Sequence, residues 1–321
     1  MRKVNLTRSQ LLRLLKDNGF EKKATAQQLG VDEASVRRAC ERLQIDTDTE
    51  RASVLAASQA TCYPTETRHG KHVCQSHTFV AIPDTHAHTI IWSYLALVCQ
   101  FMKDFKPQYC IHLGDLMDYE CLMGIQKKRY PSFDGQDIGK LEREFQASAK
   151  TISMINTSLP KDCKKVFLSG NHEHRVTELL AKAPEFANTF TLEKRIDMHG
   201  WEILPFLEKF KLAKLNFIHG EFYGKYPVSK HLDCYQKNVL FGHTHAIAQE
   251  TKPSPMREIP IWGAMCGCLC TLNADYMRNK SSRAEHGFAY GWFDQKTGDF
   301  DCRIVRIIRG NFWTESKRYR V

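Results

Sequence analysis

Five short segments of the chain place metal-binding residue types directly after an apolar run. The segments are IPDTHAH, HLGDLMD, LSGNHEH, FIHGE and FGHTH, and their candidate residues are Asp84, His86, Asp115, Asp118, Asn171, His172, Glu173, His219, His243 and His245. Imidazoles, carboxylates and a carboxamide oxygen can together hold divalent cations. Short apolar runs predict buried strands, and in open α/β sheets ligands bind beyond the carboxyl ends of strands. The five segments are therefore predicted to converge on one metal site.

The spacing inside two of these segments supports the same prediction. One residue separates Asp84 from His86, and one separates His243 from His245. Because alternate residues of an extended segment point the same way, we expect each pair to present two ligands at once. A single histidine after a strand is more often a hydrogen-bonded structural residue. Five such segments at equivalent positions favour a metal site.

Metal ligands of this kind can support hydrolysis at phosphorus. Two divalent cations about 3.5–4 Å apart can clamp the attacking and leaving oxygens of an in-line displacement and acidify a bridging water. A shared carboxylate can lie between them and offset their charge. Mixed His, Asp and Asn ligation suits Mn better than Mg, which prefers oxygen ligands and waters. We expect two divalent ions, Mn first, with Fe, Zn, Ni and Mg as alternatives.

The order D-x-H, G-D-x-x-D, G-N-H-E, H, G-H-x-H resembles that of the calcineurin-like metallophosphoesterase superfamily, over roughly residues 78–309. The overall pattern and length look closer to phage and bacterial members, some of them allied to DNA repair nucleases, than to the protein phosphatases. The resemblance implies a four-layer α/β/β/α sandwich. It also implies two ligand sets that share Asp115: Asp84, His86, Asp115 and His245 for one metal, and Asp115, Asn171, His219 and His243 for the other.

Two further roles follow from the same resemblance. His172 would protonate the leaving oxygen or stabilise the transition state. Asp118 would hydrogen-bond His172 and hold it protonated and oriented. Glu173 is expected to support the ligands from behind, because the ligand positions are already filled.

The rest of the pattern after residue 77 is that of an α/β domain, residues 77–321. Helices are predicted over residues 89–105 and 139–158. The late strand-like segments, from LNFIHG to FDCRIVRII, predict a second and mainly antiparallel sheet. In GAMCGCLC, Cys266, Cys268 and Cys270 would share one face of a strand, where they form either a thiolate metal site or, as we favour, apolar packing.

Residues 1–45 predict a small all-α domain with ten basic and five acidic residues, a net charge of +5. A first helix is expected over residues 7–16. Ala26, Gly30 and Val36 have the spacing of a helix-turn-helix, so residues 33–43 would form the recognition helix. Its candidate DNA contacts are Ser35, Arg37 and Arg38. A helical cap or an oligomerisation bundle is the alternative.

Residues 46–76 are rich in Ser, Thr and Ala and predict a linker, with one short helix near residues 52–60. It contains four possible zinc ligands, Cys62, His69, His72 and Cys74, whose spacing fits no common zinc finger. Beyond the linker, Lys127, Lys128 and Arg129 could grip a polyanion backbone beside the metal site, or form an ordinary solvated charge run. Arg175, Lys225 and Lys230 are weaker candidates for phosphate contacts.

The composition is that of a folded globular protein, with 42% hydrophobic and 26% charged residues among 321. No apolar run reaches the about 20 residues of a membrane span, and the first residues lack a signal-peptide pattern. We expect a cytoplasmic protein, in the host cytoplasm if phage-encoded, with its twelve cysteines mostly reduced. The net charge of +10 favours an anionic partner. No oligomeric state is predicted.

The substrate is the least determined property. A DNA-binding-like module beside a basic hydrolase predicts a nuclease that cleaves phosphodiester bonds, because tethering raises the local DNA concentration. The alternative is a phosphatase for nucleotides or phosphoproteins, with the N-terminal module used for protein contacts. Tyr119 and Glu120 stand where the resembling protein phosphatases have Arg-Gly, which weakens the phosphoprotein alternative. A regulator with a relic metal site is disfavoured, since every ligand position is intact.

Overall fold

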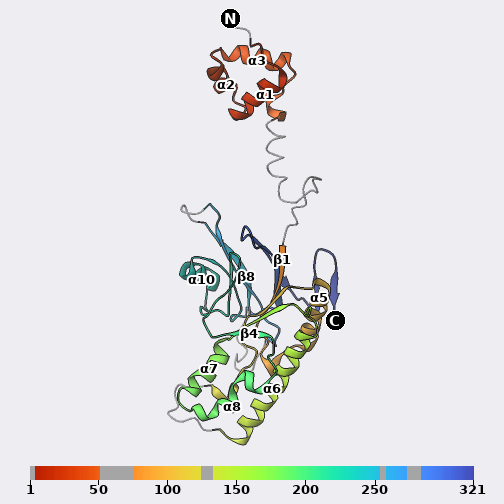
Figure 1. Cartoon of the computed structure of the whole chain (residues 1–321), viewed down its shortest axis with the longest axis vertical. Coiled ribbons are helices and arrows are strands. Elements are labelled where there is room, and N and C mark those ends of the chain that lie inside the picture. Colours follow the sequence, from red (N-terminus) through yellow and green to blue (C-terminus); the bar gives the residue numbers. More distant parts are fainter. Residues whose placement is uncertain (1–3, 51–75, 124–132, 254–257, 273–282) are drawn as a thin grey trace. The chain divides into compact units, whose positions relative to one another are not determined.

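The computed structural model describes residues 4–50, 76–123, 133–253, 258–272 and 283–321. The chain divides into two compact units, residues 1–72 and residues 73–321 (Figure 1). The predicted helix near residues 52–60 and the four possible zinc ligands in the linker lie outside the described residues, as do Lys127, Lys128 and Arg129.

In residues 4–43 of the first unit, three helices surround a small apolar core. They are α1 (Arg8–Asp17), α2 (Lys22–Leu29) and α3 (Glu33–Arg42). Thr7 and Gln10 form a reciprocal capping box that begins α1. Gly30 ends α2 with a φ of 64°, a conformation that glycine adopts without steric cost, and Asp32 caps α3. The buried side chains of this unit include Leu11, Leu15, Ala26, Val36 and Cys40.

The second unit has a six-stranded sheet in the order β11-β10-β1-β2-β3-β4. The strands are β1 (Ser76–Ile82), β2 (Tyr109–His112), β3 (Lys164–Leu168), β4 (Trp201–Leu204), β10 (Gly287–Asp294) and β11 (Phe300–Arg306). β1 to β4 are parallel, whereas β10 and β11 are antiparallel. The carboxyl ends of β1, β2 and β3 therefore meet at one edge.

The other sheet has five strands in the order β5-β6-β7-β9-β8. They are β5 (Phe210–Leu212), β6 (Leu215–Ile218), β7 (Asn238–Phe241), β8 (Ile247–Lys252) and β9 (Ile261–Cys266). The prediction of a mainly antiparallel second sheet was wrong. β6, β7 and β9 pair in parallel, and the last two long strands join the first sheet. Pairing partners are set by long-range packing, which local apolar patterns do not encode.

Helices cover the outer faces of both sheets. α5 (Trp92–Phe105) and α6 (Gly135–Asn156) pack on the first sheet, and α10 (Pro227–Tyr235) packs on the second. The other helical elements are α7 (Asn171–Leu180), α8 (Ala187–Phe190) and α9 (Leu192–Arg195), with 3-10 turns η1 (Ala87–Thr89), η2 (Glu120–Leu122) and η4 (Pro184–Phe186). β12 (Asn311–Trp313) and β13 (Arg318–Arg320) pair as an antiparallel hairpin after β11. The predicted helix 139–158 begins earlier because Asp134 accepts two backbone N–H groups and starts α6 at Gly135.

The apolar core lies in three layers between the elements. Val80 and Ile82 of β1 face α5 and α6, whereas Phe79 and Ala81 face the second sheet. On the far face of that sheet, Val228 and Leu232 of α10 pack against β7 and β9. The expected four-layer α/β/β/α sandwich is confirmed, with α10 and α5 on opposite sides (Figure 1). No helix within the described ranges is long and apolar enough to cross a membrane.

Candidate metal centre

All five predicted segments follow strands and meet at one place. β1, β2, β3, β6 and β7 end at Ile82, His112, Leu168, Ile218 and Phe241, and the candidate ligands begin one to three residues later. β1, β2 and β3 are parallel neighbours in one sheet, and β6 and β7 are parallel neighbours in the other. The site thus lies where the carboxyl ends of the two packed sheets come together.

The backbone conformation of the ligand pairs differs from the extended one that their spacing suggested. His86, His243 and His245 have φ angles of 43°, 65° and 57°, so they lie in left-handed turns rather than in extended segments. Asp115 has a φ of 47° as well. Such conformations are uncommon for residues with a side chain and cluster at functional sites. The prediction of alternate residues in a strand was wrong: the Asp84 carboxylate and the His86 imidazole do lie 3.9 Å apart, but His243 and His245 enter different groups of ligands.

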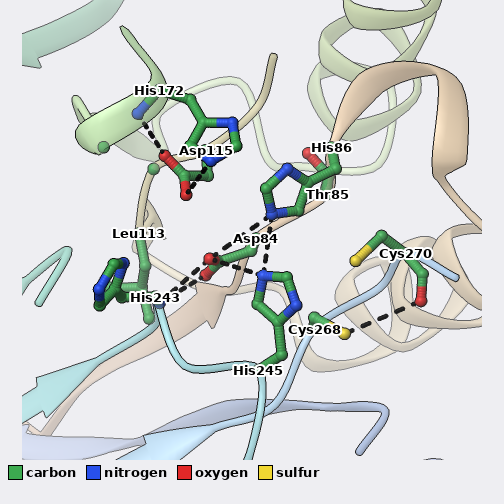
Figure 2. A network of polar contacts seen from close by, with 12 residues as sticks. Asp84, Thr85, His86, Leu113, Asp115, His172, His243, His245, Cys268 and Cys270 are labelled. Carbon is green, nitrogen blue, oxygen red and sulfur yellow. Dashed lines mark hydrogen bonds and ion pairs between the residues drawn. The ribbon is translucent and has the colours of Figure 1, made fainter. Parts of the chain in front are cut away.

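One group of ligands gathers around Asp84. The Nε2 atoms of His86 and His245 are 2.8 Å apart, and each lies near Asp84 Oδ2, at 3.9 and 3.2 Å (Figure 2). His86 Nδ1 is 2.8 Å from Asp118 Oδ1. If Nδ1 donates to this carboxylate, Nε2 carries a lone pair that is free for a cation.

A second group gathers around Asp115. His219 Nε2 is 3.0 Å from Asn171 Oδ1 and 3.4 Å from Asp115 Oδ2. The other nitrogen of His219, Nδ1, donates to the main-chain oxygen of Leu113 at 2.8 Å. His243 completes a set with Asp115 and His219 whose ligand atoms all lie within 4.8 Å of one another. These two groups correspond to the two ligand sets that the resemblance implied.

The donor atoms of this cluster fit divalent cations. Burial disfavours the charged form of His219, but the carboxylate of Asp115 outweighs it and raises the pKa of His219 to about 9. The pKa of His245 is raised to about 9 in the same way by Asp84. Burial lowers the pKa of His243 to about 4, and its buried Nδ1 has no partner among the described residues. Buried carboxylates thus require positive charge at this place, which cations would supply.

Two glycines allow the ligand loops to approach this closely. A Cβ atom on Gly170 would collide with the carboxylate of Asp115, and one on Gly242 would collide with that of Asp84. The backbone N–H of His243 also donates to both oxygens of Asp84, at 3.0 Å each. The glycines of GNH and GHTH are therefore needed for the space they leave beside the carboxylates.

Glu173 holds two ligand loops together. Its Oε2 accepts from the backbone N–H groups of Gly170 and Asp115, at 2.8 and 3.0 Å. Its Oε1 accepts from those of Leu116 and Met117, at 2.9 and 3.1 Å. Burial raises the pKa of Glu173 to about 7, and the Asp115 carboxylate adds to the shift. The sequence predicted that Glu173 supports the metal ligands. It did not predict which groups Glu173 binds, namely these four backbone amides.

His172 and Asp118 are also drawn into the cluster. His172 Nε2 lies 3.8 Å from Asp115 Oδ2, and His172 Nδ1 lies 3.5 Å from Asp118 Oδ1. The closest side-chain contact of Asp118 is instead the one with His86, at 2.8 Å, so its expected pairing with His172 is the weaker of the two. Arg175 donates to the main-chain oxygen of Asp118 at 2.6 Å and thereby supports this loop from the side.

One residue near the first group was not predicted as a ligand. The Cys270 thiol lies with the imidazoles of His86 and His245 in a set whose ligand atoms are within 4.8 Å of one another. The three cysteines were predicted to share one face of a strand. β9 ends at Cys266, however, so Cys268 and Cys270 lie in the segment that follows the strand. All three are buried, as apolar packing requires, whereas the position of Cys270 beside two imidazoles also suits the thiolate alternative. The signal in the sequence was the three cysteines of GAMCGCLC, for which a thiolate metal site was the alternative prediction.

The candidate DNA contacts of the first unit are less uniform than predicted. The side chains of Arg37 and Arg38 are 61% and 54% exposed. Ser35 is buried, and its hydroxyl lies 3.3 Å from a guanidinium nitrogen of Arg38. The expectation that Ser35 faces outward was wrong, because it lies in the first turn of α3 beside the cap Asp32.

The four-layer fold and a cluster of buried His and Asp ligands at its sheet ends define a metal-dependent phosphoester hydrolase. The chain belongs to the calcineurin-like phosphoesterase family, which its residues 77–252 match.

Related proteins come from bacteriophages. The chain is 25% identical over 264 residues to the Gene 54 protein of Mycobacterium phage D29, and 25% identical over 278 residues to that of Mycobacterium phage L5. Each match covers 77% of this chain and the whole of the relative. Among solved structures, vacuolar protein sorting 29 from Cryptosporidium parvum is 11% identical, with a TM-score of 0.40, over 77% of this chain and 99% of that one.

Proposed function

We propose that this protein is a nuclease that hydrolyses phosphodiester bonds of DNA with two divalent cations, Mn first among them. The observation that carries the proposal is a phosphoesterase metal centre in the same chain as a basic helical unit. In that unit the turn glycine and the caps join α2 to α3 as a helix-turn-helix requires. A tethered DNA-binding unit would raise the concentration of substrate at the metal centre.

The charge of the first unit supports an anionic partner. Residues 1–45 carry a net charge of +5, and Arg37 and Arg38 of α3 expose more than half of their side chains. Each arginine that neutralises a phosphate contributes to affinity through counterion release, which makes binding sensitive to salt. A protein-contact module, the alternative for this unit, would not require that sensitivity.

The residues of the metal centre divide the work. Asp84, His86 and His245 would hold one cation, Asn171, His219 and His243 would hold the other, and Asp115 lies between the two groups. Bound cations supply an activated water at neutral pH and charge stabilisation for the phosphoryl oxygens. Asp118 orients His86 by contact with its Nδ1 atom, and the main-chain oxygen of Leu113 orients His219 in the same way.

His172 is the proton donor in this proposal. Burial lowers its pKa, but the carboxylates of Asp115 and Asp118 reverse the effect, and the net shift is upward. Its Nε2 faces the Asp115 carboxylate at 3.8 Å, on the edge of the metal centre. The imidazolium can therefore deliver a proton from Nε2 to the oxygen that leaves phosphorus.

Hydrolysis assays on defined substrates test the proposal. Purified protein is incubated with Mn and with labelled single-stranded DNA, duplex DNA, RNA or free nucleotides, beside an Asp115→Ala control. We expect the wild-type protein to cleave DNA and the control to leave it intact. The nuclease proposal fails if polynucleotides stay intact while phosphomonoesters are hydrolysed, a result that would favour a nucleotide or phosphoprotein phosphatase.

DNA binding by the first unit is tested separately by its salt dependence. Replacing both Arg37 and Arg38 by alanine should lower the slope of log affinity against log salt by about two, since each phosphate contact contributes about 0.9. Arg13→Ala, an exposed arginine on α1, is the matched control. An unchanged slope in the double variant would remove α3 from the proposal.

A further inference from the structure

A cleft of about 1000 Å³ opens directly beside the metal centre. His243 and His245, one ligand of each group, line it. Figure 2 shows the same two histidines at the base of the ligand cluster. A cleft of this size lies at the upper end of ligand sites and is much larger than a phosphate group needs. It can therefore hold a part of the substrate that adjoins the reacting phosphate.

One wall of the cleft carries two exposed aromatic side chains. Tyr223 is 76% exposed and Tyr226 is 55% exposed, and both line the cleft. The ring centroid of Tyr223 is 6.3 Å from that of the ligand His243. Lys225, between the tyrosines, places its Nζ 5.0 Å from the ring centroid of Tyr226. Large exposed rings beside a metal ligand, with a cation over one of them, suit a flat aromatic group that adjoins a phosphate.

The buried side chain of His231 hydrogen-bonds both ends of the loop that carries Tyr223 and Tyr226. His231 Nδ1 donates to the main-chain oxygen of Pro227 at 2.7 Å, which leaves Nε2 as an acceptor. Nε2 accepts from the backbone N–H of Glu221 at 3.1 Å, and the ring of Phe222 packs edge-on against it. The exposed rings thus stand on a fixed base, which reduces the entropy lost when a ligand stacks on them.

The acidic residues of the cleft have partners. Glu250 accepts from the hydroxyl of Ser229, and Glu285 is paired with Arg306. Arg283 and Lys225 also line the cleft, so it carries both signs of charge and can admit an anionic chain. A phosphate backbone that enters beside Lys225 would lead to His243 and His245.

We propose that this cleft binds unpaired bases of a single-stranded polynucleotide, with the base next to the scissile phosphate stacked on Tyr223 and the following one on Tyr226. The inference rests on the proposed nuclease function and narrows its substrate. In an intact duplex the faces of the bases are stacked on one another, so they are not available to the tyrosines. A single strand offers each base to an aromatic side chain without sequence preference.

Binding assays with and without bases test the proposal. Fluorescence anisotropy measures affinity of the full chain, in chelator to prevent cleavage, for an oligothymidylate and for an abasic strand of equal length and charge. Both strands offer the first unit the same phosphates, so the ratio of the two affinities reports on bases. We expect Tyr223→Ala to lower that ratio about fivefold to hundredfold, the range for losing one stacked base. Tyr223→Phe, which keeps the ring, should preserve the ratio, and so should Trp313→Ala, an exposed aromatic of β12 outside the cleft.

The outcomes separate this inference from the proposed function. Equal affinity of the wild-type protein for the two strands, or an unchanged ratio in Tyr223→Ala, would overturn the base-stacking cleft even if DNA is cleaved. A base-dependent affinity lost in Tyr223→Ala supports the cleft even if no polynucleotide is cleaved. Cleavage assays then add a second readout, since single strands should be cut faster than a blunt duplex, and a preference for the duplex would contradict the proposal.

Discussion

Replacing Glu173 by glutamine should destabilise the second unit strongly, although the substitution changes few atoms. The carboxylate accepts four backbone N–H groups, two at each oxygen, and it is buried. Glutamine keeps one oxygen and turns its NH2 group toward the other two amides, which are donors themselves. Two buried amides then have no acceptor.

The size of the effect follows from those two amides. Leaving a buried N–H without a partner costs about 1–3 kcal/mol, so the variant should lose about 2–6 kcal/mol of unfolding free energy. Glu173→Ala strips all four amides and should lose about twice as much, which approaches the whole stability of a typical domain. Glutamine is therefore the more informative substitution.

Urea unfolding followed by tryptophan fluorescence measures the loss. All five tryptophans lie in residues 92–313, so the fluorescence reports on the second unit alone. Glu185→Gln, an exposed glutamate of η4, is the matched control and should change the unfolding free energy by less than about 0.5 kcal/mol. The unfolding is measured at pH 8 without added metal, so that ligand affinity does not contribute.

The reasoning would be refuted by a Glu173→Gln protein that unfolds within about 1 kcal/mol of the wild type, less than one unsatisfied buried amide costs at the mean. That result would mean that the four amides find other acceptors. The clamp between the two ligand loops would then not be a source of stability.

Three further predictions concern His172, Asp118 and His231. His172→Asn should lower kcat about 10²- to 10⁴-fold while metal content stays unchanged, with His174→Asn as its control in a comparison of steady-state rates and metal analysis. Asp118→Asn should weaken metal binding about 10- to 100-fold, because it releases Nδ1 of a ligand histidine, and titration with a competing chelator measures this. Burial lowers the pKa of His231 to about 4, so the unfolded chain binds this proton more readily and the stability that His231 contributes above pH 6.5 is lost as the pH falls to about 4. Urea unfolding from pH 7 to pH 4 should show a smaller loss of stability in His231→Phe than in the wild type; some loss persists, because other buried histidines such as His243 remain in the variant.

The candidate ligands could be predicted from the sequence because each follows a short apolar run. Asp84, Asp115 and His219 all lie one to three residues after strands, and parallel strands of packed sheets end at one edge. The layer order could be predicted as well, through the family pattern. Local residue order is sufficient for such features, since strand ends and turn glycines are specified within a few residues.

Other features depended on groups that are far apart in the sequence. The pairing of β10 beside β1, the left-handed turns that aim His243 and His245, and the contact of Asp118 with His86 had no local pattern. The tyrosine wall of the cleft was equally hidden, because its exposure depends on how the loop rests on a buried histidine.

The sequence by itself determined which residues could bind metal and the class of reaction, because ligand chemistry belongs to side chains and their order. Only the tertiary structure decided which of those side chains contact one another and which support the ligands. Glu173 and Asp118 act through atoms contributed by segments 32–58 residues away, and such contacts arise only when the two sheets pack and bring strand ends together.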